Sequence, residues 1–213
     1  MGIVVFDLDH TIVRPNISVA FGRYLYRIRV ISFLSVIKSI FCYLCHKKFG
    51  KSLAWLHHHI LNILFKNFSK ALLLQHVEQF FDSHLEDLFY PPSKKALFKA
   101  QNQGNITALL SSSPDFIVEP LAKRLKIPYW AGTHYAVNQE NQLVAVKEIV
   151  DGEYKAEFLR TIKNKMKFER QAITVFTDSI LDLPLLLEAG EKIAVQPDRK
   201  LRALCQQNNW KII

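Results

Sequence analysis

Two aspartates stand one residue apart directly after a short apolar run near the start of the chain. The run IVVF, residues 3–6, is typical of a buried strand, and Asp7 and Asp9 follow it at once. Carboxylates at such a place can attack as nucleophiles, exchange protons or hold a hard metal ion. An ordinary acidic turn and a fragment of a calcium loop are equally compatible with the pair alone.

Further polar residues follow the later apolar runs. Asp178 comes directly after ITVFT, and Asp182 follows four residues on. The other candidates are three serines after a second strand and a lysine in the stretch GEYK: Ser111, Ser112, Ser113 and Lys155. Acids that converge on one rim repel each other unless a cation neutralises them, and oxygen ligands favour Mg²⁺ over softer metals.

The elements that must position these residues alternate along the chain. Strands are predicted at residues 3–7, 105–111, 172–177 and 192–195, helices at 93–103, 115–126, 153–167, 181–189 and 198–208, and a hairpin at 133–147. This alternation predicts an α/β fold with a doubly wound, Rossmann-like parallel sheet. Ligands of such sheets bind beyond the carboxyl ends of the strands, where the polar residues stand.

Residues 17–90 differ from the rest of the chain in texture and charge. They contain no proline and read as successive helices. Ten lysines and arginines and no acidic residue lie between Asp9 and Glu78, whereas the remainder has 18 basic and 19 acidic residues, so the formal charge of +9 arises in the stretch between these two acids. We therefore expect no nucleic-acid partner. The simplest organisation is an α/β core of residues 1–16 and 91–213, interrupted by a helical insertion at 17–90.

Four motifs in this order resemble the haloacid dehalogenase-like (HAD) superfamily, specifically its phosphoserine-phosphatase-like branch, subfamily IB. The motifs are DLDHT, LLSSSPDFIVEPLAKRL, GEYK and TDSILDLPLL, and the tail VQPDRKLRALCQQNNWKII is similar to the usual ending of that branch. The resemblance covers nearly the whole core. It implies that residues 17–90 are a helical cap, inserted after the first strand, which closes over the site and selects the substrate.

The resemblance also implies a reaction, namely hydrolysis of a phosphomonoester through an aspartyl-phosphate. Asp7 would be the nucleophile and Asp9 the general acid and base. Mg²⁺ would be held by the carboxylates of Asp7 and Asp178 and by the backbone carbonyl of Asp9. Asp182 would orient a metal-bound water, and Thr11 would support Asp9 by a hydrogen bond.

The remaining matched residues would bind the phosphoryl group. Ser111 would do so together with the backbone N–H groups of Leu8 and Ser112, and Lys155 would offset the phosphoryl charge and restrain Asp7. Each has a plainer alternative. The serines could only cap the following helix, Lys155 could be a solvated helix residue, and Asp182 could be a helix cap.

The absence of acidic residues before Glu78 in the insertion bears on the substrate. Phosphoserine phosphatases use an acid in this region to recognise the substrate amine, and a buried ammonium without a partner is costly. We therefore expect a small phosphorylated substrate other than phosphoserine, either more anionic or more lipophilic. The alternatives are a peripheral-membrane phosphatase for a lipid-like phosphate and a non-catalytic HAD-fold binding protein.

Several features of the insertion imitate other functions. CYLCH, residues 42–46, matches haem-attachment and redox patterns, but it lies in an apolar helical stretch and is predicted to supply core or interface cysteines. The three consecutive histidines at 57–59 would fan out by about 100° each on a helix. We predict solvated or interface histidines rather than a metal site.

The apolar run at residues 30–45 is too short to span a bilayer and carries Lys38 at its middle. Its polar residues form a narrow stripe: Ser32, Ser35, Ser39 and His46. We expect the broad apolar face opposite them to pack within the cap. The alternatives are a pocket for a greasy substrate, a dimer contact and a peripheral contact with an anionic membrane.

The compartment is inferred from two further features. The N-terminus MGIVVFDLDH has no basic stretch before an apolar run, and its sixth residue does not suit a myristoylation signal. Three cysteines are too few for a disulfide framework. A cytoplasmic protein is expected, with peripheral membrane contact as the alternative.

Overall fold

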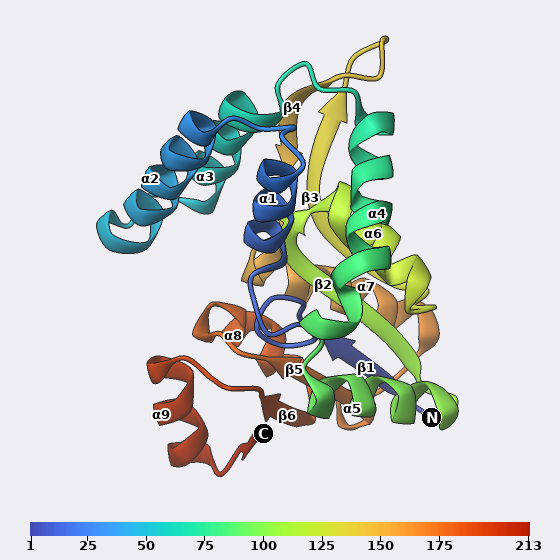
Figure 1. Cartoon of the computed structure of the whole chain (residues 1–213). Helices are drawn as coiled ribbons and strands as arrows, with labels where there is room; N and C mark the ends of the chain where they lie inside the picture. The colour runs from blue at the N-terminus through green and yellow to red at the C-terminus, as the bar shows by residue number, and fades with distance from the viewer.

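The computed structural model describes residues 1–213, and seven strands form a single sheet in the order β4-β3-β2-β1-β5-β6-β7 (Figure 1). The strands are β1 Ile3–Phe6, β2 Ile106–Pro114, β3 Tyr129–Val137, β4 Leu143–Glu148, β5 Ile173–Thr177, β6 Glu191–Ala194 and β7 Lys211–Ile212. All neighbours pair in parallel except β3 and β4, which are antiparallel. The predicted doubly wound α/β fold is confirmed.

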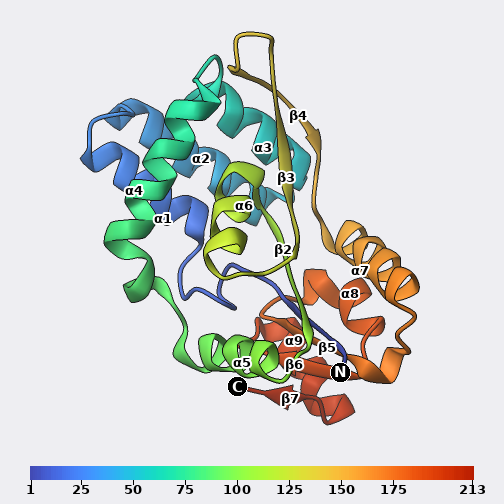
Figure 2. The same ribbon diagram turned by 90° about the vertical axis from the view of Figure 1, so that its right-hand side faces the viewer.

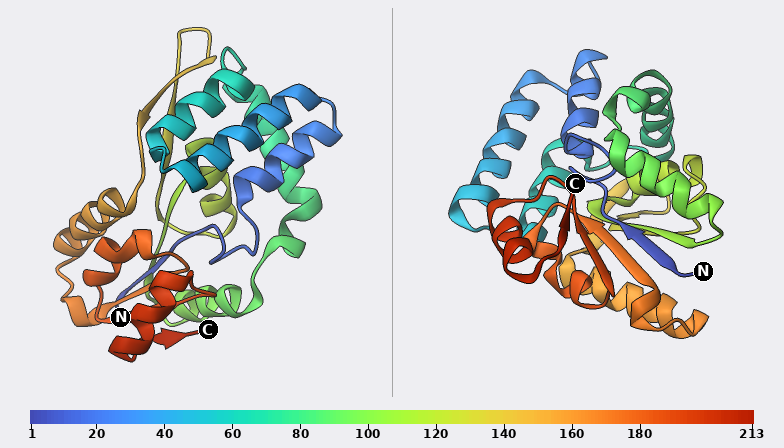
Figure 3. Two further views of the ribbon diagram at one scale, coloured as in Figure 1. Left: turned by 90° about the vertical axis from the view of Figure 1, so that its left-hand side faces the viewer. Right: turned by 90° about the horizontal axis from the view of Figure 1, so that it is seen from below.

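Helices cover both faces of the sheet, as the view from below shows (Figure 3). They are α5 Pro91–Asn102, α6 Asp115–Arg124, α7 Gly152–Met166, α8 Leu183–Leu187 and α9 Arg199–Asn208, with short 3₁₀ turns at Arg170–Ala172 and Ile180–Asp182. Because side chains alternate along a strand, β1 contributes side chains to two hydrophobic cores, one on each face of the sheet. Phe6 joins the larger cluster with α5 and α6, whereas Ile3 and Val5 join the smaller one with α7 to α9.

The segment between β1 and α5 is helical. It contains α1 Ile17–Arg27, α2 Phe33–Phe49, α3 Leu53–Ile60, a π-helical turn at Leu61–Phe65 and α4 Lys70–Leu88. The four α-helices begin at side chains that accept a hydrogen bond from the N–H group three residues on: Asn16, Ser32, Ser52 and Ser69. Such caps satisfy backbone donors that the first turn leaves unpaired, which explains where the helices start.

The chain enters and leaves this helical segment side by side. The N–H of Arg14 donates to the carbonyl of Leu88 at 2.8 Å, and the N–H of Tyr90 donates to the carbonyl of Ile12 at 2.9 Å. The two connections therefore form a short antiparallel pair beside the end of β1.

The predicted hairpin is formed by β3 and β4, although β3 begins earlier than expected, at Tyr129. Its tip lies beside the loop that precedes α4 (Figure 2). Asn67 N–H donates to the Leu143 carbonyl at 2.8 Å, and Leu143 N–H donates to the Phe68 carbonyl at 3.0 Å. The hairpin thus supports the helical segment from one side.

The apolar face of α2 does not pack as predicted. Only Cys42 is buried on this helix, and most of its apolar side chains are exposed. The helix itself lies at the outer edge of the molecule (Figure 1). The physical reason is that α2 packs on α1, α3 and the π-helical turn through its opposite side, where Ser35 and Ser39 lie beside Val36 and Cys42. No helix combines the length and the apolar character needed to cross a bilayer.

Candidate active site

The register of the central strands brings the candidate catalytic residues to one edge of the sheet. Phe6 of β1 lies opposite Leu109 of β2 and Phe176 of β5. Asp7, the next residue after Phe6, is therefore level with the end of β5 and close to the serines at the end of β2. This is the carboxyl edge at which ligands bind in open α/β sheets.

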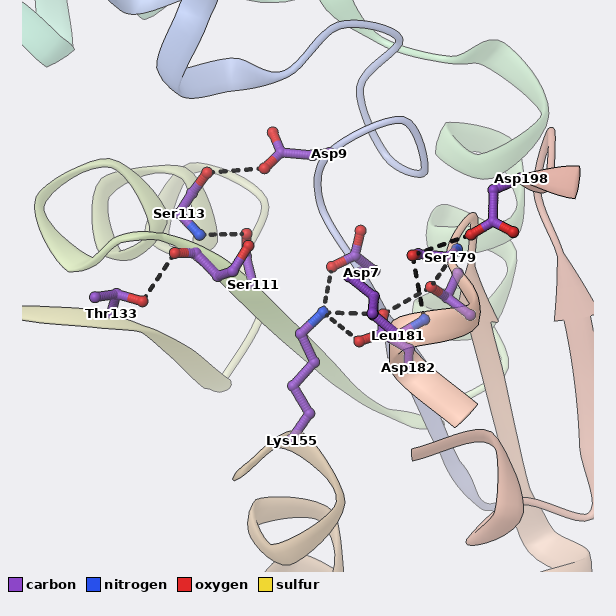
Figure 4. Close-up of polar contacts among 12 residues, drawn as sticks. Asp7, Asp9, Ser111, Ser113, Thr133, Lys155, Ser179, Leu181, Asp182 and Asp198 are labelled. Carbon is purple, nitrogen blue, oxygen red and sulfur yellow. Dashed lines mark hydrogen bonds and ion pairs between the residues drawn. The ribbon is translucent and has the colours of Figure 1, made fainter. Parts of the chain in front are cut away.

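Lys155 joins Asp7 to Asp182 in a buried cluster (Figure 4). Its Nζ lies 2.6 Å from Oδ1 of Asp7 and 2.9 Å from both carboxylate oxygens of Asp182. All three side chains are more than nine-tenths buried. Burial alone would lower the pKa of Lys155, but the carboxylates of Asp182 and Asp7 outweigh it and raise that pKa, so the lysine keeps its charge.

Local sequence explains how Lys155 reaches this place. Asp151 caps α7 by accepting a hydrogen bond from Tyr154 N–H at 3.0 Å. Gly152 allows the first turn of the helix to lie against the turn that contains Asp182, because a Cβ there would come within 2.0 Å of the Leu181 carbonyl oxygen. The glycine of the GEYK motif is thus a packing requirement for the lysine three residues later.

Asp182 is further held by the hydroxyl of Thr177, which donates to Oδ2 at 2.7 Å. The same hydroxyl accepts the N–H of Ser179 at 3.2 Å and thereby shapes the turn after β5. Both residues are buried. The sequence did not predict that Thr177 would hold Asp182. Its only signal in the sequence was the position of Thr177 next to Asp178.

Asp9 occupies a different environment from Asp7 (Figure 4). Its Oδ2 accepts from the hydroxyl of Ser113 at 2.8 Å, and its Oδ1 accepts from the N–H of Ile17, at the start of α1, at 2.6 Å. The predicted support from Thr11 is wrong, because the buried Thr11 hydroxyl has no hydrogen-bond partner. Ser113 takes that place; its position two residues after Ser111 was the only sequence signal.

A tight turn separates the two aspartates. The carbonyl of Leu8 accepts the N–H groups of Thr11, Ile12 and Val13 at 3.0–3.3 Å, and His10 has a left-handed backbone with φ 56°. The chain therefore curls at the strand end, and Asp9 turns toward α1 while Asp7 stays with Lys155. Burial raises the pKa of Asp9, and the hydrogen bonds from Ile17 and Ser113 oppose that rise.

The predicted phosphate-binding residues lie in the buried end of β2 and the turn after β1. The Ser111 hydroxyl oxygen accepts the N–H of Ser113 at 3.0 Å, which leaves its O–H free to donate. The Ser112 carbonyl accepts the hydroxyl of Thr133 at 2.8 Å. Leu8 and Ser111 are fully buried, and Ser112 is half-buried.

Asp178 begins the turn after β5 and is less buried than Asp7. Burial raises its pKa to about 6, with His10 opposing the shift and Asp182 adding to it. The turn is held from the other side by Asp198, whose Oδ2 accepts Ile180 N–H at 2.8 Å and Ser179 Oγ–H at 3.2 Å. Asp198 also caps α9, which gives the Pro-Asp turn of the tail a structural role.

The charge balance of the site fits a divalent cation. Asp7 and Asp182 are buried with Lys155 as the one buried cation, and Asp178 adds a third carboxylate at the rim. Asp9 is also buried, and burial raises its pKa. Burial raises the pKa of Asp7 well above its usual range; Lys155 opposes this, and neighbouring carboxylates add to it. No three His, Cys, Asp or Glu side chains gather as a metal site. The predicted Mg²⁺ ligands would not form such a group of three side chains, because they are two carboxylates and one backbone carbonyl.

A second buried polar group joins the helical segment to the sheet. His57 of α3 is buried, and its Nδ1 lies 2.8 Å from the Tyr135 hydroxyl of β3. Burial lowers the pKa of His57 to about 4, against an opposing backbone hydrogen bond with Ser112. His58 is exposed and His59 half-buried, so the three histidines do fan out as predicted. His57 lies at an interface.

We expect His57 to weaken the fold in acid. Its pKa is lower in the folded chain than the ordinary 6.5, so the unfolded chain takes up the proton first as the pH falls. The contribution to the free energy of unfolding is present above pH 6.5 and falls by up to about 3 kcal/mol toward pH 4. Urea unfolding of wild type and His57→Gln across this range measures it.

The matched control is His58→Gln, which changes an exposed histidine of the same helix. It should keep the pH dependence of the wild type, whereas His57→Gln should lose less stability on acidification. Identical pH profiles for wild type and His57→Gln would contradict the assignment.

Comparisons with known proteins identify the family and support the fold. The family model described as haloacid dehalogenase-like hydrolase matches residues 4–187. Phosphoserine phosphatase SerB1 of Mycobacterium tuberculosis is 24% identical over 213 residues, covering 97% of this chain and 68% of the relative. A Bordetella pertussis protein of unknown function superposes with a TM-score of 0.87 at 18% identity, covering 99% of this chain and 97% of its own.

A phosphoserine phosphatase solved as a phospho-aspartyl intermediate analogue superposes with a TM-score of 0.71 at 15% identity, covering 99% of this chain and 91% of that one. These matches define the class as an α/β hydrolytic enzyme that groups with phosphatases. The chain belongs to the haloacid dehalogenase-like hydrolase family. The prediction of an enzyme of this family is confirmed.

Proposed function

We propose that this protein is a Mg²⁺-dependent phosphomonoester hydrolase that forms an aspartyl-phosphate on Asp7. The observation that carries the proposal is the different setting of the two aspartates. Asp7 is fixed by a lysine, whereas Asp9 is held apart by Ser113 and the start of α1. Two carboxyl groups in different environments can take a nucleophilic and a proton-transfer role in one reaction.

In the first step Asp7 attacks phosphorus. Lys155 engages Oδ1, which leaves Oδ2 to form the new O–P bond as the ester P–O bond breaks. Asp9 gives its proton to the leaving oxygen, and burial favours the protonated form that this requires. Ser111 donates its free O–H to the phosphoryl group, and Lys155 offsets the charge of its oxygens.

In the second step the acyl phosphate is hydrolysed. Asp9, now ionised, takes a proton from water, whose oxygen forms a bond to phosphorus while the Asp7 O–P bond breaks. Phosphate leaves, and Asp7 is a carboxylate again. Asp9 ends each cycle protonated, as it began, because it lost one proton and regained one.

The carboxylates of Asp7 and Asp178 and the backbone carbonyl of Asp9 would hold Mg²⁺, as hard oxygen donors beside excess negative charge. When bound, the ion would neutralise phosphoryl charge and draw the phosphate toward Asp7. Asp182 would influence the metal site indirectly, because it binds Lys155 and lies in the same turn as Asp178.

We propose residues 17–90 as a cap that selects a substrate without an ammonium group. Helices α1 to α3 contain no acid, and two acids of α4, Glu78 and Asp82, are engaged by Arg124. Glu86 pairs with Lys94. Asp87, the fourth acid of α4, is exposed at the end of that helix and forms no ion pair. Because α1 to α3 offer no carboxylate, the amine of phosphoserine would find no partner there among the basic residues, at a cost that a plain phosphomonoester avoids.

An assay of phosphate release tests this function. Wild type with Mg²⁺ should hydrolyse aryl phosphate and glycerol phosphate faster than phosphoserine, and EDTA should reduce the rate to background until Mg²⁺ is returned. Asp178→Asn should raise the Mg²⁺ concentration for half-maximal rate at least ~10-fold, because it removes one ligand charge.

The matched control is Asp151→Asn, which keeps a good helix cap outside the proposed metal site. It should retain the wild-type Mg²⁺ requirement. Full activity in EDTA, or an unchanged Mg²⁺ requirement in Asp178→Asn, would exclude the proposed metal site. Absence of turnover with every ester would favour the non-catalytic binding protein instead.

A further inference from the structure

The outward face of α2 is apolar, whereas the outward face of a surface helix is usually polar. Six neighbouring apolar side chains are 43–65% exposed, and we call them the α2 stripe: Phe33, Leu34, Ile37, Ile40, Phe41 and Leu44. The side that faces the protein carries Ser35 and Ser39 beside Val36 and Cys42. Isolated exposed apolar residues are ordinary, but a continuous stripe on one helix marks an interaction surface.

The charge around the stripe is of one sign. The basic residues on α2 and its flanks are Arg27, Arg29, Lys38, Lys47, Lys48 and Lys51. No acidic residue occurs from residue 10 to residue 77, so nothing within α1 to α3 neutralises them. An apolar stripe bordered only by cations is complementary to a surface that is apolar inside and anionic outside.

An open hollow at the start of α2 lies beside the stripe. It has a volume of about 580 Å³ and is lined by the segment 26–33, including Arg27, Arg29 and Ser32. The rings of Tyr26 and Phe33 pack together in this segment, with centroids 6.1 Å apart. Two arginines and a hydroxyl beside aromatic side chains suit an anionic headgroup whose apolar part continues along the stripe.

We infer that α2 docks the protein on an anionic phospholipid membrane, lying in the plane of the interface with the α2 stripe toward the acyl chains. The charge argues against a second copy of the chain as the occupant, because two such faces would bring their basic residues together. A peripheral position also follows from the helix itself, which carries Lys38 at its middle.

Vesicle flotation tests the inference without substrate. The purified full chain should float with vesicles that contain phosphatidylglycerol and stay behind with pure phosphatidylcholine vesicles. Phe33→Ser with Phe41→Ser should reduce binding at least ~10-fold, because two aromatic side chains no longer enter the apolar layer. Lys47→Gln with Lys48→Gln should reduce it ~10-fold on anionic vesicles.

Phe98→Ser is the matched control, since Phe98 is an exposed phenylalanine of α5, outside the stripe. It should bind as wild type does, and thermal melting should show that all variants remain folded. No flotation with anionic vesicles, or equal flotation of the double Phe variant, would overturn the inference. So would a dimer in solution that the double Phe substitution dissociates. Binding is measured without turnover, so its failure leaves the proposed phosphatase reaction standing.

Discussion

Replacing Asp7 by asparagine is expected to lower turnover of any phosphomonoester by ~10⁴-fold or more while leaving the protein folded. The amide has nearly the shape of the carboxylate, but it is a far weaker nucleophile and cannot form the acyl phosphate. Phosphate release from aryl phosphate measures the loss, and circular dichroism checks the fold. Turnover within tenfold of wild type would exclude Asp7 as the nucleophile.

A trapping experiment separates the roles of the two aspartates. Acid quenching of wild type with ³²P-labelled substrate should leave label on the protein that hydroxylamine removes, as expected of an acyl phosphate. Asp7→Asn should retain none. Asp9→Asn should accumulate label from an aryl phosphate, because a good leaving group needs little protonation whereas hydrolysis still needs a base. Equal labelling of Asp7→Asn and wild type would place the intermediate elsewhere.

Replacing Lys155 by methionine is expected to damage both stability and catalysis. The change leaves the carboxylates of Asp7 and Asp182 buried without their shared cation, and breaking a buried pair in this way costs about 3–5 kcal/mol. The free energy of unfolding, measured with urea in EDTA, should fall by that amount. Turnover should fall ~10²–10³-fold, because phosphoryl charge loses a positioned cation.

The matched control is Lys163→Met on the same helix. Lys163 lies 3.0 Å from Glu188 in a partly exposed pair, so its loss should cost less than about 1 kcal/mol. Mg²⁺ should recover part of the stability of Lys155→Met, since a bound cation offsets the same carboxylates. A Lys155→Met protein as stable as Lys163→Met would show that the buried cluster contributes little.

Much of the fold could be predicted because its signals are local. The β-branched runs at β1, β2, β5 and β6 identify buried strands, and the serines at residues 32, 52 and 69 cap helices that follow them at once. The strand β7 was missed because two residues at the chain end carry no periodicity. It forms only through pairing with β6.

The parts of the site that were missed depend on tertiary contacts. The sequence does not indicate whether the hydroxyl of Thr11 or that of Ser113 will reach Asp9. The outcome depends on the turn at His10 and on the position of β2 beside β1. The role of Gly152 needs the Leu181 carbonyl that lies against it. Periodicity identified α2 as amphipathic, but it does not say which face packs.

The side-by-side connections at Ile12–Arg14 and Leu88–Tyr90 bear on how this architecture can diversify. A segment whose two ends are adjacent can be exchanged without altering the path of the remaining chain. A chimera that takes its helices from a relative would also need that relative's hairpin tip, because Asn67 and Phe68 bond to Leu143 through the backbone. The helical segment and the hairpin tip would then change together as the substrate range evolves, while the sheet and its acids stay unchanged.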